Sequence, residues 1–406
     1  MKKFILIIAF VGTFVSTVFA QDFEAMNRYM EKYSANWCKM MSIGNTGVSP
    51  TENKCQLGTP MPEFSFSKSL SSKALRGKTV VLTYWATWCG GCRLLCVDLD
   101  SVMVKHSDEY ANVQIIGVDA DEKLVNKGYV ASTFWKEKNI GYPTTAPGKA
   151  ADACAKSIDA GHPTTVIIDG DGIIRGRWDA WSPGTAGDIA LAAWIMDIAP
   201  RQGIKADVPT IDRLLGDKHY DRALYLLEQM PLDTLSISQR WEAMLNVSGQ
   251  KTIELYSSIK KKYQGKGDDG MAGMFRQPAR EYVVMMSALS DVIYSSDSQD
   301  PEILKIGREA ASVAANWGGQ SRRSSFKAQE LSLRYAQAVY RRSAKSLVTN
   351  LKYARQDNDT QKVEVLESIL KKYGISEAEY GDVSKDHQRM MQDEKEQSEH
   401  IAKIKK

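Results

Sequence analysis

The feature that most constrains this chain is an apolar strand pattern that runs directly into two closely spaced cysteines. Residues 79–84 (TVVLTY) are apolar and β-branched, which is typical of a buried strand. Cys89 and Cys92 follow in the run WATWCGGCR, and apolar residues then recur at helical spacing over 92–106. We therefore expect the two cysteines at the carboxyl edge of a sheet, where a helix begins.

This placement predicts the chemistry of the two sulfurs. The first turn of a helix presents unsatisfied N–H groups and a positive dipole end, and both favour a thiolate over a thiol. The pKa of Cys89 should therefore fall below the ordinary thiol value of about 8.5. Two intervening residues leave Cys92 within disulfide reach of Cys89. We expect Cys89 to be the exposed nucleophile and Cys92 the more buried resolving thiol, with no cofactor apart from their disulfide.

Strand and helix patterns continue to alternate through residues 59–200. Such alternation predicts an α/β sandwich in which helices flank one central mixed sheet. Further strands are expected at 113–118, 163–168 and 173–178, with helices at 129–138 and 188–198, the last stopped by Pro200.

Two stretches of this region resemble the thioredoxin-like superfamily, and within it the TlpA-like thiol–disulfide oxidoreductases that bacteria export. They are LRGKTVVLTYWATWCGGCR (75–93) and GHPTTVIIDGDGIIRGRW (161–178). The resemblance implies a thioredoxin-like fold in which Pro163 is a cis-proline facing the disulfide, with substrate bound at the neighbouring backbone. The residues expected to bind substrate or tune the site are Trp88, Gly90, Gly91, His162, Pro163 and Thr164.

The chain departs from the family pattern at several positions. Gly91 stands where relatives often carry proline, and residues 94–97 (LLCV) replace a Glu and a Pro that often follow the second cysteine. Thr83 occupies the place of the buried aspartate of thioredoxins, so Cys92 has no obvious base. His162 is expected near the sulfurs, where an imidazolium would stabilise the Cys89 thiolate. The alternative is a surface histidine without a catalytic role.

Residues 1–20 have the pattern of a secretory signal peptide, with Lys2 and Lys3 before an apolar stretch and Ala20 at the cleavage position. The alternative is a buried N-terminal helix. Export to the periplasm would place the chain in an oxidising compartment. Residues 21–58 are expected to form a helix to about residue 41 and then a loop, closed by a structural disulfide between Cys38 and Cys55.

The remaining cysteines, Cys96 and Cys154, favour buried apolar-like thiols, although a second redox pair between them stays open. A zinc ribbon needs two cysteine pairs, and only one closely spaced pair is present, so no metal is expected. Peroxidase chemistry is disfavoured because Ala86 stands where a peroxiredoxin carries Thr or Ser.

Residues 201–385 change character, because strand patterns vanish and helix start and stop signals repeat. Pro209, Asp300 and Gly374 are examples of these signals. We expect an all-α domain here, with a charged tail at 386–406. Outside the N-terminal stretch, no apolar run in the sequence is long enough to span a membrane.

Charge and composition limit the function classes. The net charge is +4, and Lys2 and Lys3 account for two of those charges, so residues 21–406 carry +2. That balance is too weak for a nucleic-acid surface. Two classes remain: an exported protein-disulfide oxidoreductase served by an upstream redox partner, and a thioredoxin-fold scaffold with little redox activity. The oxidoreductase should act on protein thiols and disulfides in the reducing or interchange direction. Its oligomeric state stays open.

Overall fold

The computed structural model describes residues 23–38, 56–105, 108–120, 131–264, 278–318 and 321–380. The chain divides into two compact units, and the division falls between Ile204 and Lys205. We call them the first unit and the second unit. The signal peptide and charged tail predicted from the sequence lie outside the described residues.

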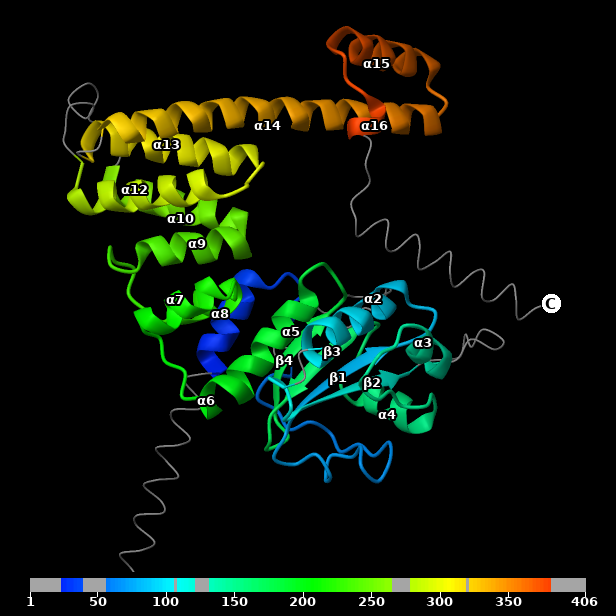
Figure 1. The fold of residues 1–406 in the computed structure, drawn as a ribbon. Coiled ribbons are helices and arrows are strands. Elements are labelled where there is room, and N and C mark those ends of the chain that lie inside the picture. Colours follow the sequence, from blue (N-terminus) through cyan, green and yellow to red (C-terminus); the bar gives the residue numbers. More distant parts are fainter. Residues whose placement is uncertain are drawn as a thin grey trace, which may run out of the picture. The chain divides into compact units, whose positions relative to one another are not determined.

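The first unit contains a four-stranded mixed sheet (Figure 1). Its strands are β1 (Thr79–Trp85), β2 (Val113–Asp119), β3 (Thr164–Ile168) and β4 (Ile174–Asp179), in the order β2-β1-β3-β4. β1 pairs parallel with β2 and antiparallel with β3, and β3 pairs antiparallel with β4. All four lie within two residues of the predicted strands, so the predicted thioredoxin-like sandwich is confirmed.

Helices cover both faces of this sheet. They are α2 (Gly90–Leu99), α3 (Ala131–Glu137), α4 (Lys149–Ser157), α5 (Thr185–Ala193) and α6 (Ala199–Arg201). π-helical turns at Asp100–Val104 and Trp194–Ile198 extend α2 and α5. Pro200 does not stop the last helix as expected, because it lies in the first turn of α6, where no N–H is needed. Helix α4 was not predicted from the sequence.

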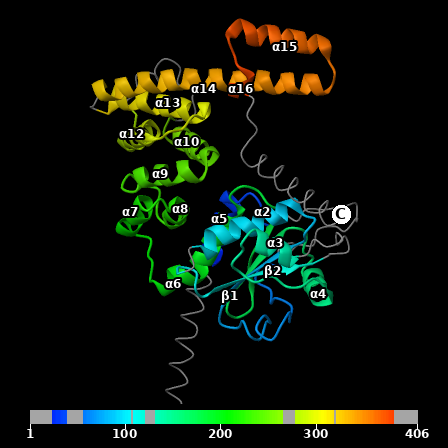
Figure 2. The same ribbon diagram turned by 45° about the vertical axis from the view of Figure 1, so that its right-hand side comes forward.

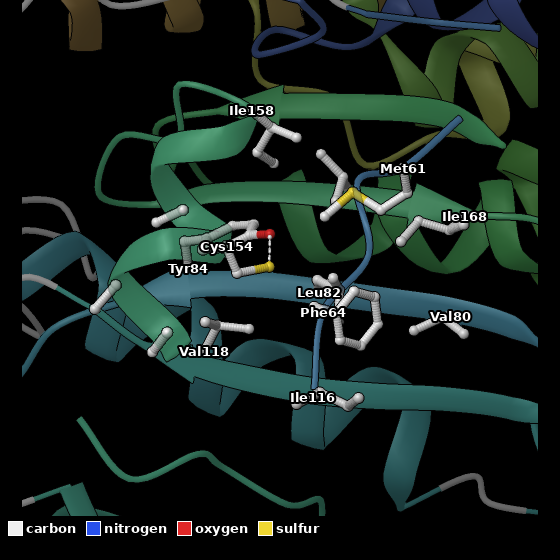
Figure 3. Packing of buried hydrophobic residues seen from close by; sticks show 14 of the residues in the cluster. Met61, Phe64, Val80, Leu82, Tyr84, Ile116, Val118, Cys154, Ile158 and Ile168 are labelled. Atoms are coloured by element: carbon white, nitrogen blue, oxygen red, sulfur yellow. Dashed lines mark hydrogen bonds between the residues drawn. The ribbon is translucent and has the colours of Figure 1, made fainter. Parts of the chain in front are cut away.

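The face covered by α4 is strongly apolar (Figure 3). Side chains alternate along a strand, so every second residue of β1 points to this face. They meet residues of β2, β3 and α4 and of the segment before β1. The labelled members of this cluster are Met61, Phe64, Val80, Leu82, Tyr84, Ile116, Val118, Cys154, Ile158 and Ile168.

The other face carries α2, α3 and α5, and aromatic rings fill it near the end of β1. The Trp85 ring lies 4.5 Å from Trp135 and 5.5 Å from Phe134, between centroids. Gly117 of β2 makes room for them, since a Cβ there would lie 2.9 Å from the Trp135 ring.

The N-terminal extension corrects one prediction. Residues 23–33 are helical, but the helix ends well before residue 41. Residues 36–38 instead pair with β4, through hydrogen bonds from Cys38 N–H to the Arg177 carbonyl (3.0 Å) and from Asp179 N–H to the Asn36 carbonyl (3.1 Å). The Trp37 ring packs edge-on against Trp178 at 5.1 Å. These long-range contacts outweigh the local helical pattern.

The second unit is helical throughout its described residues (Figure 2). Most of its helices pack on their neighbours in sequence, so the unit is a stack. None of the described helices in either unit is long and apolar enough to cross a membrane. The helices are α7 (Val208–Gly216), α8 (Tyr220–Glu228), α9 (Ile237–Val247), α10 (Gly249–Gln264), α12 (Arg280–Ser295), α13 (Pro301–Trp317), α14 (Ser321–Gln356), α15 (Thr360–Tyr373) and α16 (Glu377–Tyr380).

Local capping signals explain several of these boundaries. The Asp300 side chain accepts a hydrogen bond from the Glu302 N–H at the start of α13. Gly374 ends α15 with a left-handed backbone, at φ 65°. The sequence predicted both of these helix ends, and an all-α second region is confirmed for the described residues.

Candidate active site

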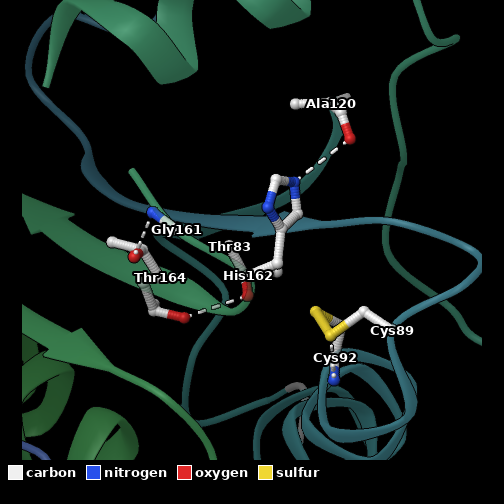
Figure 4. The surroundings of a disulfide bond; sticks show 8 residues. Thr83, Cys89, Cys92, Ala120, Gly161, His162 and Thr164 are labelled. Atoms are coloured by element: carbon white, nitrogen blue, oxygen red, sulfur yellow. Dashed lines mark hydrogen bonds between the residues drawn. A yellow bond between two sulfur atoms is a disulfide. The ribbon is translucent and has the colours of Figure 1, made fainter. Parts of the chain in front are cut away.

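Cys89 and Cys92 lie where β1 gives way to α2, joined by a disulfide with 5.2 Å between their Cα atoms (Figure 4). Cys89 is the N-cap residue of α2, and its sulfur accepts a hydrogen bond from Cys92 N–H at 3.2 Å. Its carbonyl accepts from Arg93 N–H at 3.1 Å. The first turn of the helix therefore directs a backbone donor at the Cys89 sulfur.

The two sulfurs differ in access to solvent. Cys89 is 9% exposed, whereas Cys92 is completely buried. Trp88, the residue before the pair, is 37% exposed. In the disulfide form Cys89 is thus the more accessible cysteine, although it is less open than the sequence suggested. Gly90 and Gly91 begin α2 between the two cysteines.

The peptide bond between His162 and Pro163 is cis, as the resemblance implied. Pro163 comes directly before β3 and is buried. A Cβ built on Gly91 would lie 4.0 Å from Pro163 Cδ, so the proline ring borders the loop between the cysteines. The Pro163 carbonyl accepts a hydrogen bond from Ala180 N–H at 2.8 Å.

Behind Pro163 lies a buried polar network that the sequence analysis missed. Thr164 Oγ1 donates to Asp179 Oδ1 at 2.9 Å and accepts from Gly161 N–H at 2.9 Å. The Arg177 guanidinium donates to both Asp179 oxygens at 3.0 and 3.1 Å. It also donates to the carbonyls of Ile158 (2.7 Å) and Asp159 (2.9 Å) at the end of α4.

Burial raises the pKa of Asp179, and the Arg177 charge opposes that rise. The signal for this network was present in the strand sequence 174–179 (IRGRWD), which places an Arg and an Asp two residues apart and so on one face. Thr164 is therefore a buried residue that links Pro163 to this network.

His162 lies at the rim of the site. Its ring is turned toward the Ala120 carbonyl, with 3.1 Å between Nε2 and that oxygen (Figure 4). Because a carbonyl can only accept, Nε2 carries the proton. The ring centroid lies 5.2 Å from that of Trp88.

Thr83 cannot replace the aspartate as a base, because a threonine hydroxyl does not ionise near neutral pH. Its oxygen accepts a hydrogen bond from Thr165 Oγ1 at 2.9 Å. Asp119, at the end of β2, is a completely buried carboxylate that the sequence analysis did not single out. It lies opposite Trp85 in the sheet register, and its charge contributes to a raised pKa of Cys96.

Cys96 and Cys154 are not bonded to each other, and both are free and buried. Burial raises the pKa of Cys96 from 9.0 to about 12. It also raises the pKa of Cys154, whose sulfur lies 3.2 Å from the Tyr84 hydroxyl. Cys38 is disulfide-bonded, and its predicted partner Cys55 lies outside the described residues. Among the described residues, no group of His, Cys, Asp or Glu could hold a metal ion.

A redox disulfide at the start of a helix, bordered by a cis-proline on a thioredoxin-like sheet, defines the class of thioredoxin-like thiol–disulfide oxidoreductases. The comparisons with known proteins agree with that class. Residues 56–178 match the family model named Redoxin.

Three relatives illustrate the likeness. The thioredoxin-like protein YneN of Bacillus subtilis is 26% identical over 156 residues, which are 36% of this chain and 88% of that protein. The thiol-disulfide oxidoreductase ResA of Bacillus cereus is 28% identical, covering 31% of this chain and 71% of ResA. The thiol:disulfide interchange protein DsbE of Escherichia coli is 26% identical, covering 38% of this chain and 78% of DsbE.

Among solved structures, a thiol:disulfide interchange protein of the thioredoxin family from Chlorobium tepidum is 25% identical to this chain. The match covers 34% of this chain and 96% of that structure, with a TM-score of 0.29. All of these matches span only part of the chain.

Proposed function

We propose that this chain is an exported oxidoreductase that exchanges disulfides with protein substrates in the reducing or interchange direction. Cys89 is the nucleophile and Cys92 the resolving thiol. The observation that supports these roles is the disulfide itself, in which Cys89 caps α2 and is the more exposed of the two sulfurs.

The steps follow from thiol–disulfide exchange. In the reduced protein, the Cys89 thiolate attacks one sulfur of a client disulfide, and the client's other sulfur leaves as a thiolate. The resulting mixed disulfide joins Cys89 to the client. Cys92 then loses its proton and attacks the Cys89 sulfur, which releases the second client thiolate. The client gains two electrons, and the protein is left with the Cys89–Cys92 disulfide seen in the structure.

An upstream redox partner must then return two electrons to the pair. The backbone beside Pro163 meets the client, with His162 and Trp88 on the rim of the same surface. Export is supported by the pattern of residues 1–20, and an oxidising compartment suits the bond at Cys38.

We also propose the domain limits expected from the sequence: a thioredoxin-like domain at 59–200 and a helical domain at 201–385 that recognises or presents the client. Support comes from the division of the chain between Ile204 and Lys205.

A trapping experiment tests the proposed function. In the Cys92→Ser variant the mixed disulfide cannot be resolved, so an unfolded client protein with a disulfide should accumulate as a covalent adduct at Cys89. Peptide mass mapping locates the bond. The matched control is Cys89→Ser, which should form no adduct. Equal adduct formation in both variants, or none in either, would support the scaffold class instead.

A further inference from the structure

The loop after β4 carries a tryptophan that the proposed mechanism does not use. Ala180 has a left-handed backbone at φ 74°, a conformation that residues other than glycine rarely adopt. This turn lets Ala180 N–H reach the Pro163 carbonyl at 2.8 Å. The following residue, Trp181, is thereby brought next to the start of α2. Strained backbone of this kind is concentrated at functional sites.

Trp181 lies beside the active-site loop. A Cβ built on Gly91 would lie 3.6 Å from Trp181 Cβ and 4.0 Å from Pro163 Cδ. Gly91 therefore lies in a slot between the tryptophan and the cis-proline. Because Gly91 has no side chain, the Trp181 side chain supplies apolar surface at this slot.

The indole ring is held in place by α2 itself. Trp181 Nε1 donates a hydrogen bond to Asp98 Oδ2 at 3.1 Å. Asp98 lies two turns after the cysteines on the same helix, so the ring is fixed along the helix that carries the redox pair. The ring is only half-buried, which leaves part of its surface accessible.

The N-terminal extension braces the same loop. Asn36 Nδ2 donates to Ser182 Oγ at 2.8 Å and to Thr185 Oγ1 at 2.9 Å. Ser182 N–H also bonds to Thr185 Oγ1 at 3.1 Å. The residue after Trp181 is therefore tied to the start of α5 and to residue 36, and the loop is rigid on both sides of the tryptophan.

We infer that Trp181 is a specificity-determining residue that contacts the client beside its reacting cysteine and favours clients with apolar residues at that place, while Asp98 is the residue that positions it. The inference rests on the proposed function of Cys89 and Cys92. Trp88 and Trp181 together border the redox pair with aromatic surface, and aromatic rings gain most from apolar partners.

The test uses two peptides of equal length and charge, each carrying one cysteine disulfide-bonded to glutathione. Leucine and phenylalanine flank the cysteine in one peptide, and serines flank it in the other. The measured quantity is the second-order rate constant for reduction of each peptide by the reduced full-length protein. The redox potential of the Cys89–Cys92 pair is measured in parallel against glutathione.

The wild-type protein should prefer the apolar peptide. Trp181→Ala should lower the rate constant for that peptide about tenfold, with a much smaller loss for the serine peptide and no change in potential. Trp181→Phe should keep most of the preference. Asp98→Ala should lower the preference, whereas Asp98→Asn retains an acceptor oxygen and should resemble wild type. Trp317→Ala, at an exposed tryptophan of α13, is the matched control and should change nothing.

Three results would overturn the inference. They are equal rate constants for the two peptides in the wild type, an equal loss for both peptides in Trp181→Ala, and a shift in potential that accounts for the loss. A wild-type protein that reduces neither peptide would instead contradict the proposed function, and this inference with it.

Discussion

The two units use buried polar groups in different ways. In the second unit, Arg240 is 4% exposed and donates to the carbonyls of Leu227 and Met230, at the end of α8. Its polar contacts thus close a helix end. In the first unit, Arg177 and Asp179 bond to each other and to Thr164, directly behind Pro163. All six cysteines also lie before residue 155. A buried arginine thus closes a helix end in both units, and in the first unit the same arginine also supports the redox site through Asp179 and Thr164.

The largest effect should come from removing the nucleophile. Cys89→Ser should lower the rate of peptide disulfide reduction by about a thousandfold or more, because a hydroxyl cannot form the mixed disulfide. Leu333→Ser, at a residue 67% exposed on α14, should leave that rate within about twofold, since no cysteine lies in its unit. The assay is second-order reduction kinetics. A comparable loss in Leu333→Ser would place part of the chemistry in the second unit.

The next effect concerns ion pairs in the two units. The Arg177–Asp179 pair is buried, with side chains 2% and 4% exposed. Asp179→Ala leaves an uncompensated buried charge and should cost about 3–5 kcal/mol. Glu254→Ala breaks the Lys251–Glu254 pair of α10, whose side chains are 29% and 49% exposed, and should cost no more than about 1 kcal/mol.

Urea denaturation measures both of these free energies of unfolding. A cost of about 1 kcal/mol or less for Asp179→Ala would mean that the network behind Pro163 adds little to the stability of the first unit.

The two units should also differ in how their free energy of unfolding changes at alkaline pH. The pKa of Cys96 is raised from 9.0 to about 12 by burial, so the folded protein keeps this proton where the unfolded chain loses it. The resulting stability is present below pH 9 and is lost as the pH rises from 9 to 12. The expected slope is about 1.4 kcal/mol per pH unit for one proton.

Between pH 9 and 10 the first unit should therefore lose more stability than the second unit, which has no cysteine but contains tyrosines, such as Tyr256 and Tyr282, whose pKa is also raised by burial. Urea titrations at pH 8, 9 and 10 measure this difference. The Cys96→Ala, Cys154→Ala double variant should show a shallower profile, and the slope that remains is due to Tyr84 and Tyr142, whose pKa burial raises well above the ordinary value. A wild-type profile no steeper than that of the variant would contradict the burial of these thiols.

The smallest effect concerns His162. If its imidazolium supports the Cys89 thiolate, His162→Ala should raise the pKa of Cys89 by less than about 1. His219→Ala, at the residue before α8, is the matched control and should have no effect. An unchanged thiolate titration in His162→Ala would remove His162 from the mechanism and leave it as a rim residue bonded to Ala120.

The sequence could predict the strands and helix ends that are encoded by short segments of the chain. The strands and the boundaries of α13 and α15 follow from alternation, capping and left-handed glycine, which short segments encode. Helix α4 was not predicted because its N-cap residue, Gly148, has no side chain to cap the helix, and the helix consists largely of small residues.

Features that depend on distant contacts could not be predicted. The N-terminal helix ends early because Trp37 packs against Trp178, which is 141 residues away in the sequence. The bond from Trp181 to Asp98 likewise joins segments 83 residues apart. Neither contact produces a periodic pattern of residues in the sequence, so sequence patterns could not predict them.

The central claim is that Cys89 is the ionised, accessible sulfur of the reduced protein. Its most direct test is the pH dependence of iodoacetamide alkylation in the fully reduced protein, resolved by site with mass spectrometry. We expect Cys89 to react first, with a midpoint below the ordinary thiol value of about 8.5, and Cys92 to stay protected. A midpoint at or above that value, or faster modification of Cys92, would contradict the account.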